Sequence, residues 1–218
     1  YVKGLQADVA QVSLAQLVSH SAGLVRDGSD AGQWALRQPF LSEQALRADL
    51  ASGLTLAAGE RFKYSNHGYG LLGLAIEAVT GEPYNAWIAR EVVAASGLTE
   101  TVPDAQHLRA RTPLTLGHSA KHPVGQRQAL PARMSTNALS PATGFVSTAA
   151  DLARFIGSLA PDAQHGLLSR ASRREMLRRQ WQSEHDSTGR WYGLGTIAGT
   201  LKGMAGAWDH VGHSGGFP

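Results

Sequence analysis

Residues 64–81 read Tyr-Ser-Asn-His-Gly-Tyr-Gly-Leu-Leu-Gly-Leu-Ala-Ile-Glu-Ala-Val-Thr-Gly. The apolar residues at positions 71, 72, 74, 75, 76, 78 and 79 form a broad stripe at helical spacing, which predicts a helix buried on most of its sides. We expect Asn66 to cap this helix through its side-chain oxygen, and Gly81 followed by Pro83 to end it. The glycines at positions 68, 70 and 73 each lower helix propensity by about 1 kcal/mol relative to alanine. We therefore expect another backbone or a ligand to lie close to the first turns.

The rest of the chain is predicted to place helices first and strands last. Helices are predicted over residues 13–18, 42–51, 84–93, 148–159 and 169–181, with capping boxes at Ser13 and Thr148. Residues 26–40 and 97–135 are polar or interrupted by proline, and they read as loops. The five arginines of the helix over 169–181 are expected to form a solvated face. Strands are predicted over 191–197 and 208–212, joined through a glycine-bearing stretch at 199–206.

Composition limits the classes of function. The 218 residues are 43% hydrophobic and 17% charged, which is ordinary for a globular protein, and a net charge of +3 does not argue for nucleic-acid binding. Cysteine is absent, so disulfides, thiolate catalysis and cysteine-based zinc sites are excluded. No His-Glu-x-x-His motif or glycine-rich phosphate loop occurs, and we expect no metal and no cofactor. No apolar run reaches the ~18 residues of a membrane-spanning helix.

Three further stretches accompany Tyr64-Ser65-Asn66. They are Leu-Val-Ser-His-Ser-Ala-Gly-Leu at 17–24, Ser-Pro-Ala-Thr-Gly-Phe-Val-Ser-Thr-Ala-Ala-Asp-Leu at 140–152 and His-Ser-Gly-Gly-Phe-Pro at 213–218. In this order and spacing the four stretches resemble the serine β-lactamase-related family, which includes class C β-lactamases, D-alanyl-D-alanine carboxypeptidases and many carboxylesterases.

The resemblance implies an α+β fold of the β-lactamase/transpeptidase type, with a helical lobe beside an antiparallel sheet. Residues 1–218 would be part of one such domain, incomplete at both ends. Residues 1 to about 135 would form the helical lobe and the loops of the cleft. Residues from about 136 to 218 would form helices and strands of the α/β lobe.

The nucleophile motif of this family, Ser-x-x-Lys, is not found in the chain. The lysines are Lys3, Lys63, Lys121 and Lys202, and the residues three positions before the last three are glutamate, histidine and glycine. The family order places the motif upstream of residues 17–24. We therefore expect this chain, which opens without Met or a signal peptide, to begin after the nucleophile.

The resemblance implies catalytic roles for Tyr64 and Asn66. Tyr64 matches the tyrosine that relays the proton between nucleophile and leaving group, and Asn66 matches the amide that orients the lysine and bonds the substrate's carbonyl. A tyrosine with an unperturbed pKa near 10 is only about 0.1% ionised at pH 7. Tyr64 would therefore need a nearby positive charge or a concerted relay to act as a base.

His213, Ser214 and Gly215 match the family's Lys-Thr-Gly strand, with histidine in place of lysine. The resemblance makes the backbone N–H of Gly216 one oxyanion donor. Histidine is mostly uncharged at neutral pH and binds a substrate carboxylate less well than lysine does, so the replacement favours neutral esters or amides. Alternatively, His213 only bonds a strand edge.

Two other histidine and serine patterns have simpler interpretations. His20 is expected to be a packed, structural histidine, because no partner motif surrounds it. Residues 212–216 satisfy the Gly-x-Ser-x-Gly elbow of α/β-hydrolases, but that elbow requires a following helix, an acid and a histidine, and only two residues remain.

We expect the full-length protein to be a serine hydrolase that acts through an acyl-enzyme on esters or amides. The alternative within enzymes is a β-lactamase or a D-alanyl-D-alanine carboxypeptidase, and the alternative outside them is a catalytically inactive relative that binds a ligand or a partner. The expected partner is a small ester, amide or peptide substrate, with no nucleic acid and no membrane-spanning segment. The resemblance favours a bacterial periplasmic or secreted location.

Overall fold

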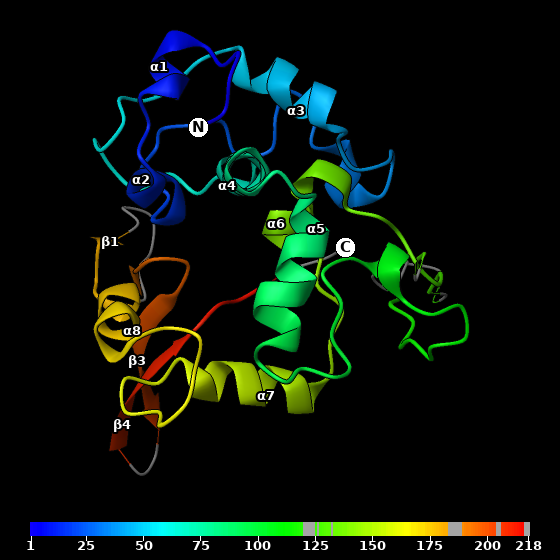
Figure 1. Cartoon of the computed structure of the whole chain (residues 1–218), viewed down its shortest axis with the longest axis vertical. Helices are drawn as coiled ribbons and strands as arrows, with labels where there is room; N and C mark the ends of the chain where they lie inside the picture. Colours follow the sequence, from blue (N-terminus) through cyan, green and yellow to red (C-terminus); the bar gives the residue numbers. More distant parts are fainter. Residues whose placement is uncertain (120–124, 126, 132, 183–188, 204–205, 216–218) are drawn as a thin grey trace.

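Helix α4 (Asn66–Thr80) crosses the middle of the helical part of the protein in a computed structural model that describes residues 1–119, 125, 127–131, 133–182, 189–203 and 206–215. In Figure 1, α2 (Leu14–Val18) lies to the left of α4 and α3 (Glu43–Leu50) lies above it to the right, while α5 (Tyr84–Ile88) and α6 (Ser140–Thr143) lie below it to the right. The predicted helix over this stretch is confirmed.

The remaining elements follow the predicted order of helices first and strands last. They are α1 (Ala7–Ala10), α7 (Ala149–Ser158), α8 (Arg170–Leu177), the 3₁₀ turns at Gly32–Ala35, Ala105–His107 and Asn137–Leu139, and the strands β1 (Trp181–Gln182), β2 (Trp191–Tyr192), β3 (Ile197–Gly203) and β4 (Gly206–Gly212). The helix after Pro83 changes at Ala89 into a π-helical turn that runs to Ala94. Helices and a sheet that stay separate along the chain confirm the α+β class.

The N-terminal cap of α4 is Ser65, and the expectation that Asn66 provides it is wrong. The Ser65 hydroxyl accepts a hydrogen bond of 2.8 Å from the backbone N–H of Gly68. Asn66 is the first helical residue, and its side-chain amide donates elsewhere. At the other end, Gly81 adopts φ 72°, a left-handed conformation, and ends the helix as predicted.

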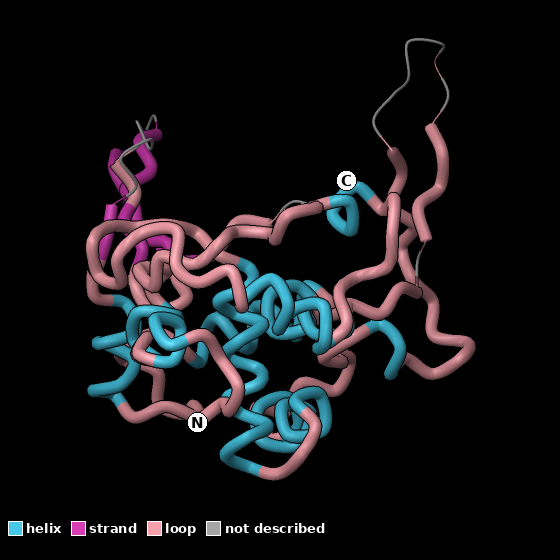
Figure 2. Tube along the Cα trace, turned by 90° about the horizontal axis from the view of Figure 1, so that it is seen from above, coloured by secondary structure: helices cyan, strands magenta, loops and turns pink. Residues whose placement is uncertain are grey.

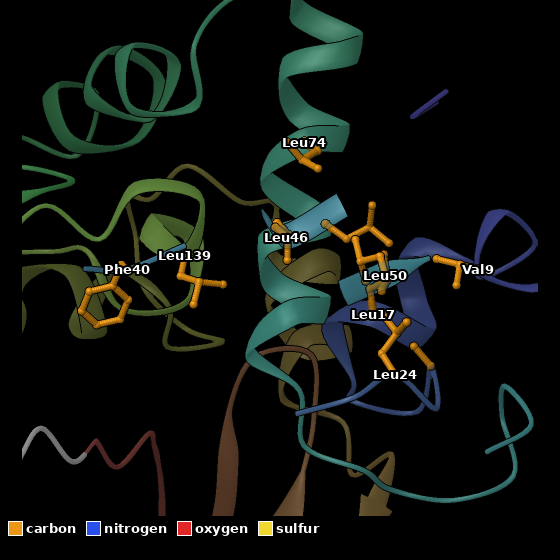
Figure 3. Close-up of a cluster of buried hydrophobic side chains, with 10 residues drawn as sticks. Val9, Leu17, Leu24, Phe40, Leu46, Leu50, Leu74 and Leu139 are labelled. Atoms are coloured by element: carbon orange, nitrogen blue, oxygen red, sulfur yellow. The ribbon is translucent and has the colours of Figure 1, made fainter. Parts of the chain in front are cut away.

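The buried face of α4 is narrower than its apolar stripe suggests. Leu71 and Leu74 belong to the main core, whereas Val79 is 64% exposed. The core gathers leucines from α2, α3 and α4 (Figure 3). Glycines provide much of the remaining contact: a Cβ built on Gly73 would lie 2.4 Å from Cγ of Pro141 in α6. The expected close approach of another segment to the glycine-bearing turns is confirmed.

The sheet has the order β1-β2-β3-β4, and all of its neighbouring strands are antiparallel. The strands gather at one edge of the molecule (Figure 2). The stretch at 199–206, predicted only to join two strands, contributes to the strands themselves: β3 and β4 form a hairpin in which Gly199 pairs with His210. The predicted strand over 191–197 is instead interrupted after Tyr192 by a turn in which the N–H of Gly193 donates to the carbonyl of Thr196.

Helix α8 differs from prediction at one arginine. Arg173 is only 6% exposed, and its guanidinium donates to the backbone carbonyls of Leu168 and Ala163. It therefore ties α8 to the preceding loop, and the arginines do not all form a solvated face. Within the described ranges, no helix is long and apolar enough to cross a membrane.

Candidate active site

The segment that carries Tyr64 is held against the loop after α2. The backbone N–H of Lys63 donates to the carbonyl of His20 at 2.7 Å, and the N–H of Ser65 donates to Nδ1 of His20 at 3.1 Å. The Ser65 hydroxyl donates to the carbonyl of Val25 at 2.6 Å. Hydrogen bonds on both sides of Tyr64 therefore hold its backbone in place against this loop.

His20 lies under the ring of Tyr64. The two ring centroids are 4.1 Å apart, and His20 also contacts the rings of Tyr69 and Tyr192, at 4.9 Å and 4.8 Å. His20 is 2% exposed. Its packed environment agrees with the expectation of a structural histidine, and it supports the face of the candidate catalytic tyrosine.

Asn66 is oriented by a carboxylate that the sequence did not point to. Its side-chain amide nitrogen donates to Oδ1 of Asp27 at 2.6 Å, and Oδ2 of Asp27 pairs with Nε of Arg26 at 3.0 Å. The guanidinium of Arg26 lies over the ring of Tyr64, 5.5 Å from its centroid. A carboxylate only accepts hydrogen bonds, so Asp27 fixes the amide of Asn66 with its nitrogen toward Asp27.

His213 follows the end of β4 and reaches the same place from the sheet. Its ring centroid lies 6.2 Å from that of Tyr64 and 5.7 Å from that of Tyr192. Nε2 of His213 is 3.1 Å from the hydroxyl of Tyr192, and Nδ1 is 2.6 Å from the carbonyl of Ser214. The structure thus brings Tyr64 and His213 together. Asn66 lies two residues after Tyr64 at the start of α4, and the catalytic roles of all three stay predictions.

Burial keeps His20 and the three tyrosines of the site neutral at ordinary pH. Burial raises the pKa of Tyr64, while Arg26 lowers it and Asp27 raises it by smaller amounts. Burial and then the neighbouring His213 lower the pKa of His20 to about 3. Burial also raises the pKa of Tyr69 to about 12 and that of Tyr192 above its ordinary range. The net shift of Tyr64 makes a free phenolate less accessible, which favours a concerted relay over a separate base.

Ser214 and Gly215 are exposed and lie beyond the end of β4. The bond to the Ser214 carbonyl comes from His213, so the histidine is not oriented toward the Ser214 hydroxyl as a base would be. Gly216, the predicted oxyanion donor, lies outside the described residues.

Among the residues that the structure describes, no three His, Cys, Asp or Glu side chains gather as a metal ion would require. A cavity of about 570 Å³ lies between α4, α5 and the segment 101–107. Its described lining includes Gly73, Tyr84 and Pro141, and it does not include the candidate site residues.

Sequence reasoning missed Arg26, Asp27 and Tyr192. Arg26 and Asp27 lie in a polar stretch without periodicity, and Asp27 meets Asn66 across 39 positions of sequence. Tyr192 was expected only as part of a strand. The signal that could have found it is the sequence Trp-Tyr-Gly-Leu-Gly at 191–195, in which glycines follow an aromatic pair within a predicted strand.

Solved structures with the same architecture cover nearly all of this chain. A D-stereospecific amidohydrolase from Streptomyces sp. is similar with a TM-score of 0.75 and 21% identity, over 95% of this chain and 62% of its own. A D-amino acid amidase from Ochrobactrum anthropi SV3, complexed with L-phenylalanine amide, gives 0.71 and 21%, over 98% and 59%. An octameric penicillin-binding protein homologue from Pyrococcus abyssi gives 0.70 and 20%, over 89% and 48%.

These likenesses establish the fold, and the chain spans less than two thirds of the length of each of these proteins. A search of curated protein sequences gave no match. The family model described as Beta-lactamase matches residues 1–218. That match covers the whole chain and agrees with the fold and with the four sequence stretches, and the chain therefore belongs to the beta-lactamase family.

Proposed function

We propose that the intact protein is a serine hydrolase that acts through an acyl-enzyme on neutral esters or amides. The observation that carries this proposal is the meeting of Tyr64 and His213, whose rings lie 6.2 Å apart although 149 positions separate them. Tyr64 comes from the start of α4 and His213 from the end of β4, so the site lies where helices meet the sheet. Membership of the beta-lactamase family supports the same reaction class.

In this proposal Tyr64 relays the proton, and the N–H of the Asn66 amide that is not given to Asp27 donates to the acyl-side carbonyl. The nucleophilic serine and its lysine would lie in residues outside these 218, because the chain holds no Ser-x-x-Lys. A lysine ammonium near Tyr64 would add to the charge of Arg26 and oppose the effect of burial on the pKa of Tyr64. The hydroxyl of Tyr64 would then pass a proton from the serine to the leaving group in one concerted movement.

The substrate preference follows from His213. Its Nδ1 is engaged by the Ser214 carbonyl and its Nε2 by Tyr192, so the neutral ring has no N–H left for a substrate carboxylate. Amides are included because two proteins of similar fold are an amidohydrolase and an amidase. We therefore favour neutral acyl substrates over β-lactams and acyl-D-alanyl-D-alanine.

The test compares three substrates with the intact protein: a chromogenic ester, an amino-acid amide and a chromogenic β-lactam. We expect turnover of the ester or the amide to exceed that of the β-lactam, and Tyr64→Phe to abolish most of it. Faster turnover of the β-lactam would instead support the β-lactamase alternative. Turnover of none of the three by a folded intact protein would support an inactive, ligand-binding relative.

A further inference from the structure

We propose that Tyr192 is a positioning residue that fixes the imidazole of His213 in the candidate active site, an inference that rests on the proposed function. Tyr192 is 5% exposed and stands at the end of β2, while His213 is exposed and stands just after β4. The hydroxyl oxygen of Tyr192 lies 3.1 Å from Nε2 of His213, within hydrogen-bonding distance. The buried Tyr192 thus holds the exposed His213 side chain at the point where substrate would arrive.

The tautomer of His213 follows from its two partners. Nδ1 faces the carbonyl oxygen of Ser214 at 2.6 Å, and a carbonyl only accepts, so Nδ1 carries the hydrogen in the neutral ring. Nε2 then has a lone pair and no hydrogen, and the hydroxyl of Tyr192 donates to it. Both nitrogens are satisfied, and the plane of the ring is set.

The same hydroxyl can serve the charged ring. Tyr192 also interacts with Tyr69, and the hydroxyl of Tyr69 donates to the carbonyl of Val18 at 2.9 Å, so the oxygen of Tyr69 is free to accept a hydrogen bond. When Nε2 of His213 carries a hydrogen, it donates to the oxygen of Tyr192, and the hydroxyl hydrogen of Tyr192 turns toward Tyr69. One side chain therefore holds His213 in either protonation state, without movement of heavy atoms.

The packing around Tyr192 makes this arrangement rigid. Its ring contacts His20 at 4.8 Å and Phe62 at 5.3 Å between centroids, and both of these belong to the segments that brace Tyr64. Burial keeps Tyr192 in its phenol form, so it remains able to donate. Tyr192 thereby fixes the distance between the sheet side and the helix side of the site.

The experiment uses the intact protein, with Tyr192→Phe as the variant and Tyr84→Phe as a control. Tyr84 is a partly buried tyrosine, and it belongs to the separate cluster with Ile88 and Val93. We expect Tyr192→Phe to lower kcat/KM about two- to tenfold, the worth of one net hydrogen bond. In a His213→Gln background the same change is expected to cost nothing further, because the tyrosine acts only through the histidine. An equal loss in both backgrounds would show a merely structural role and overturn the proposal.

A second readout does not depend on turnover. The ¹⁵N signal of Nε2 in His213, identified by its loss in His213→Gln, is recorded at a pH where the ring is neutral. We expect the chemical shift of this signal to change in Tyr192→Phe and to stay the same in Tyr84→Phe. An unmoved signal in Tyr192→Phe would overturn the positioning role even if the protein is an active hydrolase. A moved signal in a protein without hydrolase activity would support the contact while the proposed function fails.

Discussion

The backbone N–H of Ser65 donates a hydrogen bond to Nδ1 of His20, across 45 positions of sequence. His20 must therefore present a lone pair at Nδ1, which a protonated imidazole cannot do. Burial, with a smaller effect from His213, accordingly lowers the pKa of His20 to about 3. The neutral state of one buried histidine is thus coupled to the position of the segment that carries Tyr64.

This coupling predicts a dependence of folding stability on pH. Between about pH 6.5 and pH 3 the unfolded chain binds a proton at His20 that the folded chain does not. Stability from this group is therefore present above pH 6.5 and is lost as the pH falls through that range. His20→Asn keeps a side-chain acceptor and tolerates the φ of 56° at this position, but it does not titrate. Urea unfolding at several pH values should show a flatter profile for the variant, and equal slopes would contradict the prediction.

Much of the fold was predictable from local signals. Ser13, Ser42 and Thr148 each begin a helix as predicted, because a hydroxyl that accepts from the N–H three residues later is a signal contained within one turn. The extension of β3 through residues 199–203 was missed because Gly199 and Gly203 are poor strand formers. Their pairing with β4 comes from the partner strand, which a local pattern does not contain.

Only the candidate site residues that belong to a family motif could be predicted from the sequence. Tyr64 and His213 meet as the family resemblance implied. The bond between Asp27 and Asn66 was not predictable, because it joins a loop without periodicity to a helix 39 positions away. The error over the cap of α4 has a related cause: Ser65 and Asn66 are both good capping residues, and tertiary contact with Asp27 decides between them.

Replacing Tyr64 by Phe tests its role as the proton relay. The ring stacking on His20 at 4.1 Å should survive in the variant, since only the hydroxyl is removed. Positioned acid–base groups contribute about 10²–10⁴-fold to rate, so kcat of the intact enzyme should fall by that order with little change in Tm. Steady-state kinetics and a thermal melt measure both. A variant that keeps more than half of wild-type kcat would exclude Tyr64 from the chemistry.

Arg26 and Asp27 should shift the pKa of Tyr64 in opposite directions. Arg26 favours the phenolate and Asp27 disfavours it, so Arg26→Gln should raise this pKa further and Asp27→Asn should lower it. The asparagine retains an oxygen that can accept from Asn66. The measurement is tyrosinate absorbance against pH, with each variant compared with the same variant carrying Tyr64→Phe. Shifts of the same sign would show that conformational change outweighs charge.

Replacement by alanine should change the stability of the protein differently at a closely packed glycine of α4 and at a helical glycine with no neighbouring atoms. At Gly73 the new Cβ would lie 2.4 Å from Cγ of Pro141, whereas at Gly157 in α7 no heavy atom lies within 4 Å. Gly73→Ala should therefore destabilise the intact protein by about 1–3 kcal/mol through overpacking. Gly157→Ala should stabilise it by about 0.5–1 kcal/mol through helix propensity. Urea midpoints measure both changes, and equal effects would argue against close packing of α4 on α6.

Ser214 provides the last prediction, because it stands in a Gly-x-Ser-x-Gly pattern and is exposed. Its hydroxyl has no suitable base in its neighbour: Nδ1 of His213 is bonded to the Ser214 carbonyl and Nε2 to Tyr192. A serine without an adjacent base is a weak nucleophile, and these 218 residues hold no Ser-x-x-Lys. The 218-residue chain produced alone should therefore resist covalent labelling by a serine-directed fluorophosphonate, while the intact protein should be labelled. Labelling of the chain that disappears in Ser214→Ala, and persists in the matched surface variant Ser169→Ala, would make Ser214 the nucleophile and overturn the assignment of the chemistry to Tyr64 and an external serine.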